Sequence, residues 1–441
     1  MHVMKSFRIN QSEMLSHDSI ERSILKTSRG KRNREDVKEV LDNLEPEIEI
    51  VYNMVSSGNF KPRKHQTVVI NEKNYLKVRR IIKPDFRYEQ IVHHLIVQSI
   101  SDCIMSGMYQ YVLGSVPNRG AHMGARSIEK WIKKDPANTK YVLKMDIRHF
   151  YESVNHRVLK RWLKKKFRDK FLLELFDVVI AAADMGLPLG YYTSQWFANF
   201  LLQPLDHYIK EKLHIKYMTR YVDDIVCLGR NKKELHKVRL AISEYLENEL
   251  GLTMKGNWQV FRFEYTAEEL AITCKSLKEL ERLGNDLEAK RIRYKSKMHK
   301  GKRKIFIKLS GVKNKRELLS SILDKYHATS EVLLMVHGRP LDYMGFEFHR
   351  NRTVMRESIM LRATKKAVQV SKQEKINPKD AASLLSSMGW IKHTDTYDMF
   401  LERIKPIVNI KTLRKVVSKN QRRLNNAVKL ENSRGHTARA A

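Results

Sequence analysis

Lys216-Tyr-Met-Thr-Arg-Tyr-Val-Asp-Asp-Ile-Val-Cys-Leu-Gly229 is the stretch from which the organisation of this chain can be worked out. Two β-branched and aromatic runs flank the adjacent acids Asp223 and Asp224, a pattern typical of two strands joined by a turn. Asp is common in turns, so an ordinary hairpin is one explanation of the pair. Asp is also unfavourable inside strands, so two acids at this point equally suggest a functional site.

A third acid, Asp146, lies near the end of Tyr141-Val-Leu-Lys-Met-Asp-Ile147, which has the composition of a buried strand. Helical patterns separate it from the hairpin, residues 232–250 are again helical, and residues 252–263 return as a strand. This order predicts a split β-α-β sheet backed by helices, and therefore an α+β fold.

Neighbouring strands of such a sheet would bring Asp146, Asp223 and Asp224 together. Like charges repel at short range, and divalent cations resolve that repulsion. Mg²⁺ accepts carboxylate ligands and leaves room for phosphate oxygens, with Mn²⁺ as an alternative ion. Two such ions can serve an in-line nucleotidyl transfer.

The charge of the chain points to a polyanionic partner. Its 441 residues include 84 Lys or Arg and 49 Asp or Glu, so the formal net charge is 84 − 49 = +35. Such an excess is not needed for folding, and a nucleic acid is the leading candidate to balance it. The three cysteines are far apart, which disfavours a zinc site or disulfide framework. No apolar run has the length of a membrane span, and we expect a soluble, cytoplasmic protein without a membrane partner.

Four motifs occur in the order of the reverse transcriptase motifs: Asp146-Ile-Arg-His-Phe-Tyr151, Leu189-Gly-x-x-x-Ser-Gln195, Tyr221-Val-Asp-Asp224 and Tyr343-Met-Gly-Phe346. The chain thus resembles bacterial, group II intron-like reverse transcriptases over roughly residues 30–420. Its Leu-Gly-x-x-x-Ser-Gln form is similar to that of diversity-generating retroelement and defence-associated enzymes. The resemblance implies a right-hand polymerase with fingers, a ferredoxin-like palm and a helical thumb.

The resemblance also implies roles for individual residues. Asp146 and Asp223 would be direct metal ligands, assisted by the Ile147 carbonyl, with Asp224 in support. Tyr151 would be the steric gate against a 2′ hydroxyl. The triphosphate and the nascent base pair would be held by Lys77, Arg79, Arg80, Gly190, Gln195 and Lys255. The primer end would be held by Tyr343, Met344, Gly345 and Phe346. Independently of the resemblance, the cation of a turn-rich loop and three cations of the basic helical segment are expected to meet the primer or template backbone: Arg119, Arg362, Lys365 and Lys366.

Residues 265–337 depart from the family pattern and are expected to be an insertion that binds a structured RNA or a partner chain. Nine of the fifteen residues from Lys290 to Lys304 are Lys or Arg, and none is acidic. A solvated charged segment is the alternative explanation. The expected RNA-binding patch is Lys290, Arg291, Arg293, Tyr294, Lys295, Lys297, Lys300, Lys302, Arg303 and Lys304.

The expected boundaries follow from these motifs. They are an N-terminal helical extension (1–62), fingers (63–140), palm (141–264), insertion (265–337), primer-grip-like hairpin (338–350), helical thumb (351–430) and a disordered tail (431–441). Thr193 or Ser194 is expected to cap the helix after the loop that contains Gly190.

The predicted activity is synthesis of cDNA from an RNA template and deoxynucleotides. The template is expected to be a dedicated, structured non-coding RNA, in antiphage defence or in a diversity-generating retroelement. An accessory protein or a homo-oligomer is a further possible partner. Two alternatives remain open: untemplated or protein-primed synthesis at the same site, and a catalytically idle RNA-binding scaffold.

Overall fold

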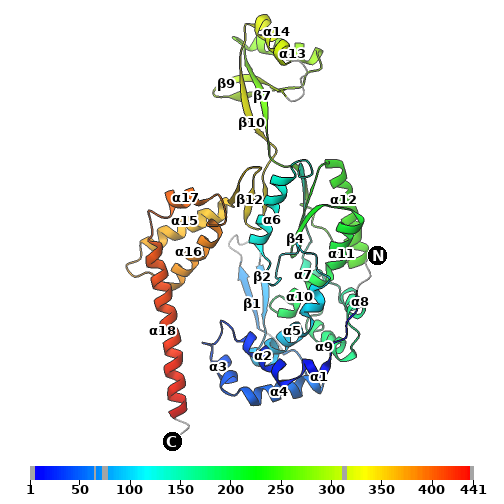
Figure 1. Cartoon of the computed structure of the whole chain (residues 1–441), viewed down its shortest axis with the longest axis vertical. Helices are drawn as coiled ribbons and strands as arrows, with labels where there is room; N and C mark the ends of the chain where they lie inside the picture. The colour runs from blue at the N-terminus through cyan, green and yellow to red at the C-terminus, as the bar shows by residue number, and fades with distance from the viewer. Residues whose placement is uncertain (1–4, 64–65, 72–77, 310–314, 438–441) are drawn as a thin grey trace. The chain divides into compact units, whose positions relative to one another are not determined.

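The protein, seen here as a computed structural model, is described over residues 5–63, 66–71, 78–309 and 315–437 (Figure 1). The chain divides into two compact units. Unit 1 comprises Met1–Val260, Asp342–Phe348 and Arg352–Ala441, and unit 2 comprises Phe261–Leu341 and His349–Asn351. No helix among the described residues has the length and apolar character required to cross a membrane.

A four-stranded sheet, here called the central sheet, carries the motifs of unit 1. Its strands are β3 (Tyr141–Asp146), β4 (Tyr217–Tyr221), β5 (Asp224–Gly229) and β6 (Gln259–Arg262), in the order β4-β5-β3-β6. Strand β3 is interior, which explains why Val142, Leu143 and Met145 are buried although they point to both faces.

Helices connect these strands. Between β3 and β4 lie α7 (Phe150–Ser153), α8 (His156–Lys166), α9 (Lys170–Ile180), α10 (Tyr192–Leu201), α11 (Gln203–His207) and the π-helical turn η2 (Tyr208–Lys212). Between β5 and β6 lie α12 (Lys232–Tyr245) and η3 (Leu246–Leu250). The elements follow one another along the chain as β-α-β-β-α-β, and β3 lies between β5 and β6 in the sheet. This is the split β-α-β arrangement, so the predicted α+β class is confirmed.

The N-terminal part packs onto the same core. It contains α1 (Gln11–Met14), α2 (His17–Thr27), α3 (Glu35–Asp42), α4 (Leu44–Ser56), the ribbon β1 (Gln66–Asn71) and β2 (Val78–Lys83), η1 (Phe86–Gln90), α5 (Ile91–Met105) and α6 (Ala121–Lys134). Helix α5 is apolar on nearly all sides and is buried between α2 and α10, as its contacts with both show. A single apolar core therefore joins α1 to α5 and η1 to the central sheet.

The C-terminal part of unit 1 is a small sheet followed by helices. The sheet contains β11 (Leu341–Tyr343), β12 (Phe346–Phe348) and β13 (Thr353–Met355). The helices are α15 (Glu357–Ser371), α16 (Pro378–Ile391), α17 (Tyr397–Arg403) and α18 (Ile410–Thr437), and they share a separate apolar core. Helix α18 continues to Thr437, so the disordered tail expected from residue 431 is wrong for residues 431–437.

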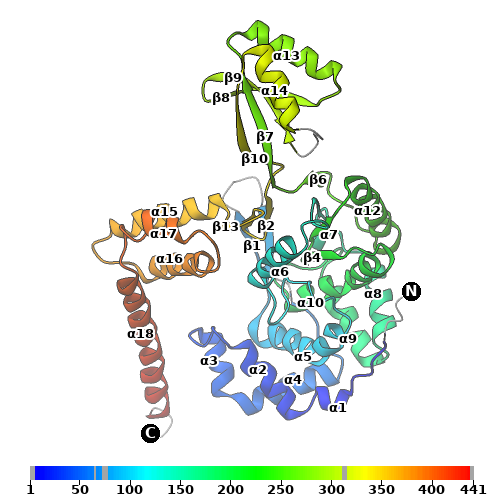
Figure 2. The ribbon, with the colours of Figure 1, turned by 45° about the horizontal axis from the view of Figure 1, so that its top comes forward.

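Unit 2 contains β7 (Tyr265–Thr273), α13 (Leu277–Ala289), β8 (Tyr294–His299), β9 (Lys302–Lys308), α14 (Lys315–Tyr326) and β10 (Thr329–His337). Ser276 caps α13 in a capping box with Glu279. The Ser276 hydroxyl accepts a hydrogen bond from the Glu279 backbone nitrogen, and the Glu279 carboxylate accepts one from the Ser276 backbone nitrogen. The strands form one antiparallel sheet in the order β10-β7-β9-β8 (Figure 2).

Candidate active site

The central sheet places two acids opposite each other. Asp146 is the last residue of β3 and Asp224 the first of β5, and the two are paired in the antiparallel register. Paired residues in adjacent strands project to the same face of a sheet. Asp223 lies in the two-residue turn between β4 and β5, directly before Asp224. The sheet therefore gathers the three predicted acids at one edge.

The turn that carries Asp223 has an unusual backbone. Val222 has a φ of +57°, a value that a β-branched residue rarely adopts. Its carbonyl accepts a hydrogen bond of 2.7 Å from Nη1 of Arg220. A Cβ atom on Gly114 would lie 2.7 Å from the Val222 nitrogen, so only glycine allows the preceding loop to approach this closely.

Arg220 is itself fixed by partners that sequence reasoning did not identify. Its side chain forms a fully buried ion pair with Asp206 and also donates to the side-chain oxygen of Asn199 at 3.1 Å. The Asn199 amide in turn donates to the Gly114 carbonyl at 2.9 Å. The only sequence signal was a cation inside an apolar strand, where burial requires a partner.

Asp224 is supported from a distant part of unit 1. The Tyr343 hydroxyl donates to the Asp224 carbonyl at 2.9 Å, and the Tyr343 side chain is fully buried. Tyr343 therefore holds the backbone of an acid, and its ring offers no surface to a primer. Phe346 is also buried, whereas Met344 and Gly345 form the turn of the hairpin with φ values of +52° and +84°.

Lysines lie beside the acids. Lys255 Nζ is 3.4 Å from an Asp146 oxygen, and Lys144 Nζ is 3.9 Å from an Asp224 oxygen. Burial raises the pKa of Asp224 to about 7; Lys144 opposes this rise and the neighbouring Asp146 and Asp223 add to it. Lys144 was not among the predicted site residues.

The donor set fits a hard divalent cation. Oδ1 of Asp224 is buried and has no hydrogen-bond partner in the described part of the chain, so it is available as a ligand. Carboxylate oxygens are the ligands that Mg²⁺ prefers. The three acids are less tightly gathered than His17, Asp18 and Glu21, an exposed surface group whose ligand atoms lie within 4.8 Å of one another. A shared ion would have to draw the three acids together.

The predicted nucleotide-binding residues lie on several elements. Gly190 has a φ of +119°, and a Cβ atom there would lie 1.9 Å from the Ile82 carbonyl of β2, so its loop packs directly on that strand. The Ile82 nitrogen donates to the Leu189 carbonyl at 2.7 Å. Tyr151 is on α7 and half-buried, and its carbonyl accepts from the Leu187 nitrogen at 2.6 Å. Gln195 is exposed on α10.

Two of the three predicted phosphate ligands lie on one strand. Arg79 and Arg80 lie on β2, and Lys77 lies outside the described residues.

Helix α10 begins after Tyr191 without a side-chain cap, so the predicted cap by Thr193 or Ser194 is wrong. Both residues are buried, and the Thr193 hydroxyl instead contacts the His93 ring at 3.0 Å.

The cations predicted to bind primer and template differ in whether other protein groups already engage them. Arg119 donates to the Tyr109 carbonyl at 2.8 Å and is half-buried, so its guanidinium is occupied by the fold. Lys366 is ion-paired with Asp380 at 2.5 Å. Arg362 and Lys365 are exposed on α15 and remain accessible to a phosphate backbone.

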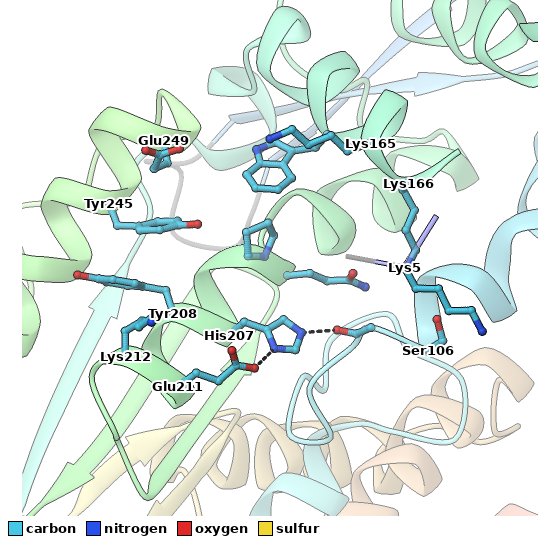
Figure 3. Close-up of a pocket in the computed structure, with 14 residues that line it drawn as sticks. Lys5, Ser106, Lys165, Lys166, His207, Tyr208, Glu211, Lys212, Tyr245 and Glu249 are labelled. Atoms are coloured by element: carbon cyan, nitrogen blue, oxygen red, sulfur yellow. Dashed lines mark hydrogen bonds and ion pairs between the residues drawn. The ribbon is translucent and has the colours of Figure 1, made fainter. Parts of the chain in front are cut away.

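A separate cavity of about 890 Å³ lies away from the acids, between α8, α11, η2 and η3 (Figure 3). Tyr208 and Tyr245 stack there with ring centroids 4.5 Å apart. His207 bridges the Gly107 carbonyl at 2.9 Å and the Glu211 carboxylate at 2.7 Å. None of the three acids lines this cavity, so it is distinct from the candidate active site.

Residues 70–258 match the family described as "Reverse transcriptase (RNA-dependent DNA polymerase)". This part of the chain is a reverse transcriptase domain. The match contains Asp146, Asp223, Asp224 and Lys255, and it ends before unit 2 begins. The family resemblance expected from the four motifs is thereby confirmed.

Two bacterial proteins are similar to parts of the chain. Retron Ec73 reverse transcriptase of Escherichia coli is 28% identical over 140 residues, which are 29% of this chain and 44% of that protein. Protein YkfC of Escherichia coli K12 is 24% identical over 178 residues, which are 38% of this chain and 46% of that protein. The chain thus spans less than half the length of either relative.

Two solved structures of telomerase align with about half of the chain. Apo telomerase from Candida tropicalis, truncated from its C-terminal domain, gives a TM-score of 0.35 at 13% identity over 48% of this chain and 54% of that one. Telomerase from Candida albicans in complex with a TWJ fragment of telomeric RNA gives a TM-score of 0.33 at 13% identity over 48% and 45%.

Proposed function

We propose that this chain is an RNA-directed DNA polymerase whose active site is the acidic edge of the central sheet. The observation that carries the proposal is the in-register pair Asp146 and Asp224, with Asp223 on the adjoining turn, inside a reverse transcriptase domain. The charge of +35 supports a nucleic-acid substrate.

Asp146 and Asp223 would hold two Mg²⁺ ions, with the Ile147 carbonyl and Asp224 in support. Bound ions would activate the primer 3′ hydroxyl and neutralise the leaving pyrophosphate. Lys255 lies beside Asp146, which supports a role for it at the leaving pyrophosphate, where it would donate a proton.

The protein's own residues would orient the incoming deoxynucleotide. The loop around Gly190 is fixed on β2, which carries Arg79 and Arg80, so sugar and triphosphate would be bound between these elements. Tyr151 would pack below the sugar and exclude a 2′ hydroxyl. Tyr343 would act through Asp224, and Met344 with Gly345 would be the part of the hairpin that meets the primer.

The template would be a structured non-coding RNA dedicated to this enzyme. The similarity to a retron reverse transcriptase supports a role in antiphage defence, and the Leu189-to-Gln195 motif equally suits a diversity-generating retroelement. An accessory protein or a second copy of the chain would be a further partner.

Primer extension tests this function. The full chain, an RNA template with an annealed DNA primer, deoxynucleotides and Mg²⁺ should give a product whose sequence is complementary to the template. Product without complementarity would instead indicate untemplated synthesis, and RNA binding without any product would indicate an idle scaffold. Tyr151→Ala should raise ribonucleotide use at least about tenfold, since about 1.4 kcal/mol of discrimination corresponds to that factor.

A further inference from the structure

Unit 2 has the same strand order as the central sheet but lies outside the reverse transcriptase domain. Its chain order is β-α-β-β-α-β, and its helices α13 and α14 share one apolar core with the sheet (Figure 2). That core contains Leu270 and Ile272 of β7 and Ile305 and Ile307 of β9. Both helices therefore cover the same face, and no helix among the described residues of unit 2 packs on the opposite face of the sheet, here called the open face.

Side-chain alternation decides which cations of the basic run reach the open face. Phe306 of β9 is paired with Lys295 of β8 and Ala271 of β7, and all three point away from the helices because Ile305 and Ile307 point toward them. By the same register the open face carries five lysines. They are Lys295, Lys297, Lys302, Lys304 and Lys308.

The remaining cations of the predicted patch lie elsewhere. Arg303 alternates to the helix side of β9, Lys300 is at the tip of the β8–β9 hairpin, and Lys290 to Arg293 precede β8. Tyr294 packs under α13, where its hydroxyl contacts Glu288 at 3.2 Å. The continuous basic run of the sequence is therefore divided between two surfaces of unit 2.

The open face remains positive after its acids are counted. Glu331 pairs with Lys304 at 2.6 Å, and Glu269 lies 2.9 Å from the His337 ring. Five lysines less these two acids leave 5 − 2 = +3 among the described residues of the face. Three uncompensated cations on one sheet surface suit a phosphate backbone.

Aromatic rings lie among these cations. Lys297 Nζ is 4.3 Å from the centroid of the Phe306 ring and His299 meets the same ring edge-on, and the ring is buried. Tyr265 and His337 stack with centroids 5.3 Å apart, and Lys308 donates to the Tyr265 hydroxyl at 2.6 Å. Rings interleaved with cations bind unpaired bases by stacking, which a duplex does not permit.

A buried acceptor provides a second, independent indication of a ligand. Glu269 is 2% exposed, and its Oε2 has no hydrogen-bond partner in the described part of the chain. An unsatisfied buried carboxylate oxygen is costly unless something donates to it. The exocyclic amino group of an unpaired base is such a donor, whereas in a duplex that group is engaged by its own partner base.

We propose that the open face of unit 2 binds single-stranded RNA. The lysines contact the phosphates, and the bases stack at Tyr265–His337. This inference rests on the proposed function for the choice of RNA, and it assigns to unit 2 a single-stranded segment of RNA distinct from the part paired at the polymerase site.

Fluorescence anisotropy with the full chain tests this assignment. The probe is a labelled twelve-nucleotide, mixed-sequence RNA, titrated without deoxynucleotides and with EDTA, so the result does not depend on polymerase activity. The variant Lys295→Ala/Lys297→Ala/Lys308→Ala should weaken binding at least about tenfold. Its salt slope should fall by about 2, because three phosphate contacts each contribute about 0.7.

A matched variant off the open face is Lys290→Ala/Arg293→Ala/Arg303→Ala, which removes the same charge and should change the dissociation constant less than about threefold. Equal loss in the two triple variants would overturn the proposal. Tyr265→Leu should weaken RNA binding about fivefold or more with an unchanged salt slope, in line with the loss of one stacking contact. Full affinity in that variant would also contradict it.

Two competitors define the ligand. Duplex RNA of the same sequence and single-stranded DNA should each compete about tenfold less well than the unlabelled RNA strand. Equal competition by the duplex would exclude the single-strand assignment, and equal competition by DNA would exclude the RNA assignment. Primer extension on the same preparations reports the proposed function separately, so either proposal can fail while the other holds.

Discussion

Arg220 and Asp206 form a fully buried bidentate ion pair beneath the turn that carries Asp223. Nε and Nη2 of Arg220 donate to the two Asp206 oxygens at 2.8 and 2.6 Å, and neither side chain is exposed. Burial raises the pKa of Asp206, and Arg220 opposes this rise. Because Nη1 of the same guanidinium donates to the Val222 carbonyl, the pair links the core of the domain to the position of Asp223, an acid of the proposed active site.

Breaking this pair should cost both stability and activity. Arg220→Met leaves a buried, uncompensated Asp206 and should lower the free energy of unfolding by about 3–5 kcal/mol, measured by urea denaturation. The surface pair Lys133 and Glu129 provides the control, since Lys133→Met should cost less than about 1 kcal/mol.

The double variant Arg220→Met/Asp206→Leu separates the two effects. Removing both charges should restore most of the lost stability. Primer extension should stay at least about tenfold below wild type, because nothing then donates to the Val222 carbonyl. Recovery of activity together with stability would show that Arg220 does not position the turn.

Tyr343→Phe should reduce activity with little change in fold. The substitution removes only the hydroxyl that donates to the Asp224 carbonyl. A lost hydrogen bond of this kind should cost about 1 kcal/mol in the free energy of unfolding and about fivefold in extension rate. Tyr52→Phe, at an exposed tyrosine, should change neither quantity. An unchanged extension rate in Tyr343→Phe would remove this residue from the account of the site.

Gly190→Ala should disturb nucleotide binding. The added Cβ would meet the Ile82 carbonyl, and the φ of +119° is unfavourable for alanine, so the loop and β2 have to move apart. The KM for deoxynucleotides should rise at least about tenfold in single-nucleotide extension. Gly389→Ala, where a Cβ meets nothing within 4 Å, should leave the KM unchanged. Similar KM values for both variants would contradict the close packing of this loop.

The stability of unit 1 should depend on pH through His94. Burial, with Lys31 and Lys26 nearby, lowers the pKa of His94 from 6.5 to about 4, and its ring stacks on Tyr192. In the unfolded chain this histidine gains a proton near pH 6.5, so its contribution to stability is present above that pH and is lost as the pH falls toward 4.

His94→Phe keeps a ring for the stack and cannot titrate. Between pH 7 and pH 4 the wild type should lose about 1–2 kcal/mol more of its free energy of unfolding than this variant. This figure is smaller than the full pKa shift of His94 would give, because solvent screens the charge on a half-buried ring. Parallel losses in the two proteins, measured by urea denaturation at each pH, would rule out His94 as the source.

Sequence reasoning located the acids because alternation and turn composition are local properties. The two runs around Asp223 and Asp224 are β4 and β5, and the strand carrying Asp146 is their neighbour. The φ of Val222 could not be predicted, since valine disfavours it and it depends on the hydrogen bond from Arg220 and the close approach of Gly114. These contacts join segments that are far apart in the chain.

The basic segment from Lys290 to Lys304 shows what the sequence could not predict, namely which of its cations share a face of the sheet. Its charge was evident in the sequence, but only the strand register shows that Lys295 and Lys297 share a face that Arg303 does not. Tyr343 was expected at the primer and is buried beneath Asp224 instead, because its aromatic ring completes a core that the sequence alone does not reveal.

The most direct measurement is Mg²⁺-dependent primer extension on an RNA template by the wild type and by Asp223→Ala/Asp224→Ala. The wild type should extend the primer with complementary deoxynucleotides, and the double variant should lose all detectable extension while it still binds the template. Among single variants, Asp223→Asn should lose more activity than Asp224→Asn, because Asp223 would be the direct ligand. Persistent, template-complementary synthesis by the double variant would contradict the assignment of the active site.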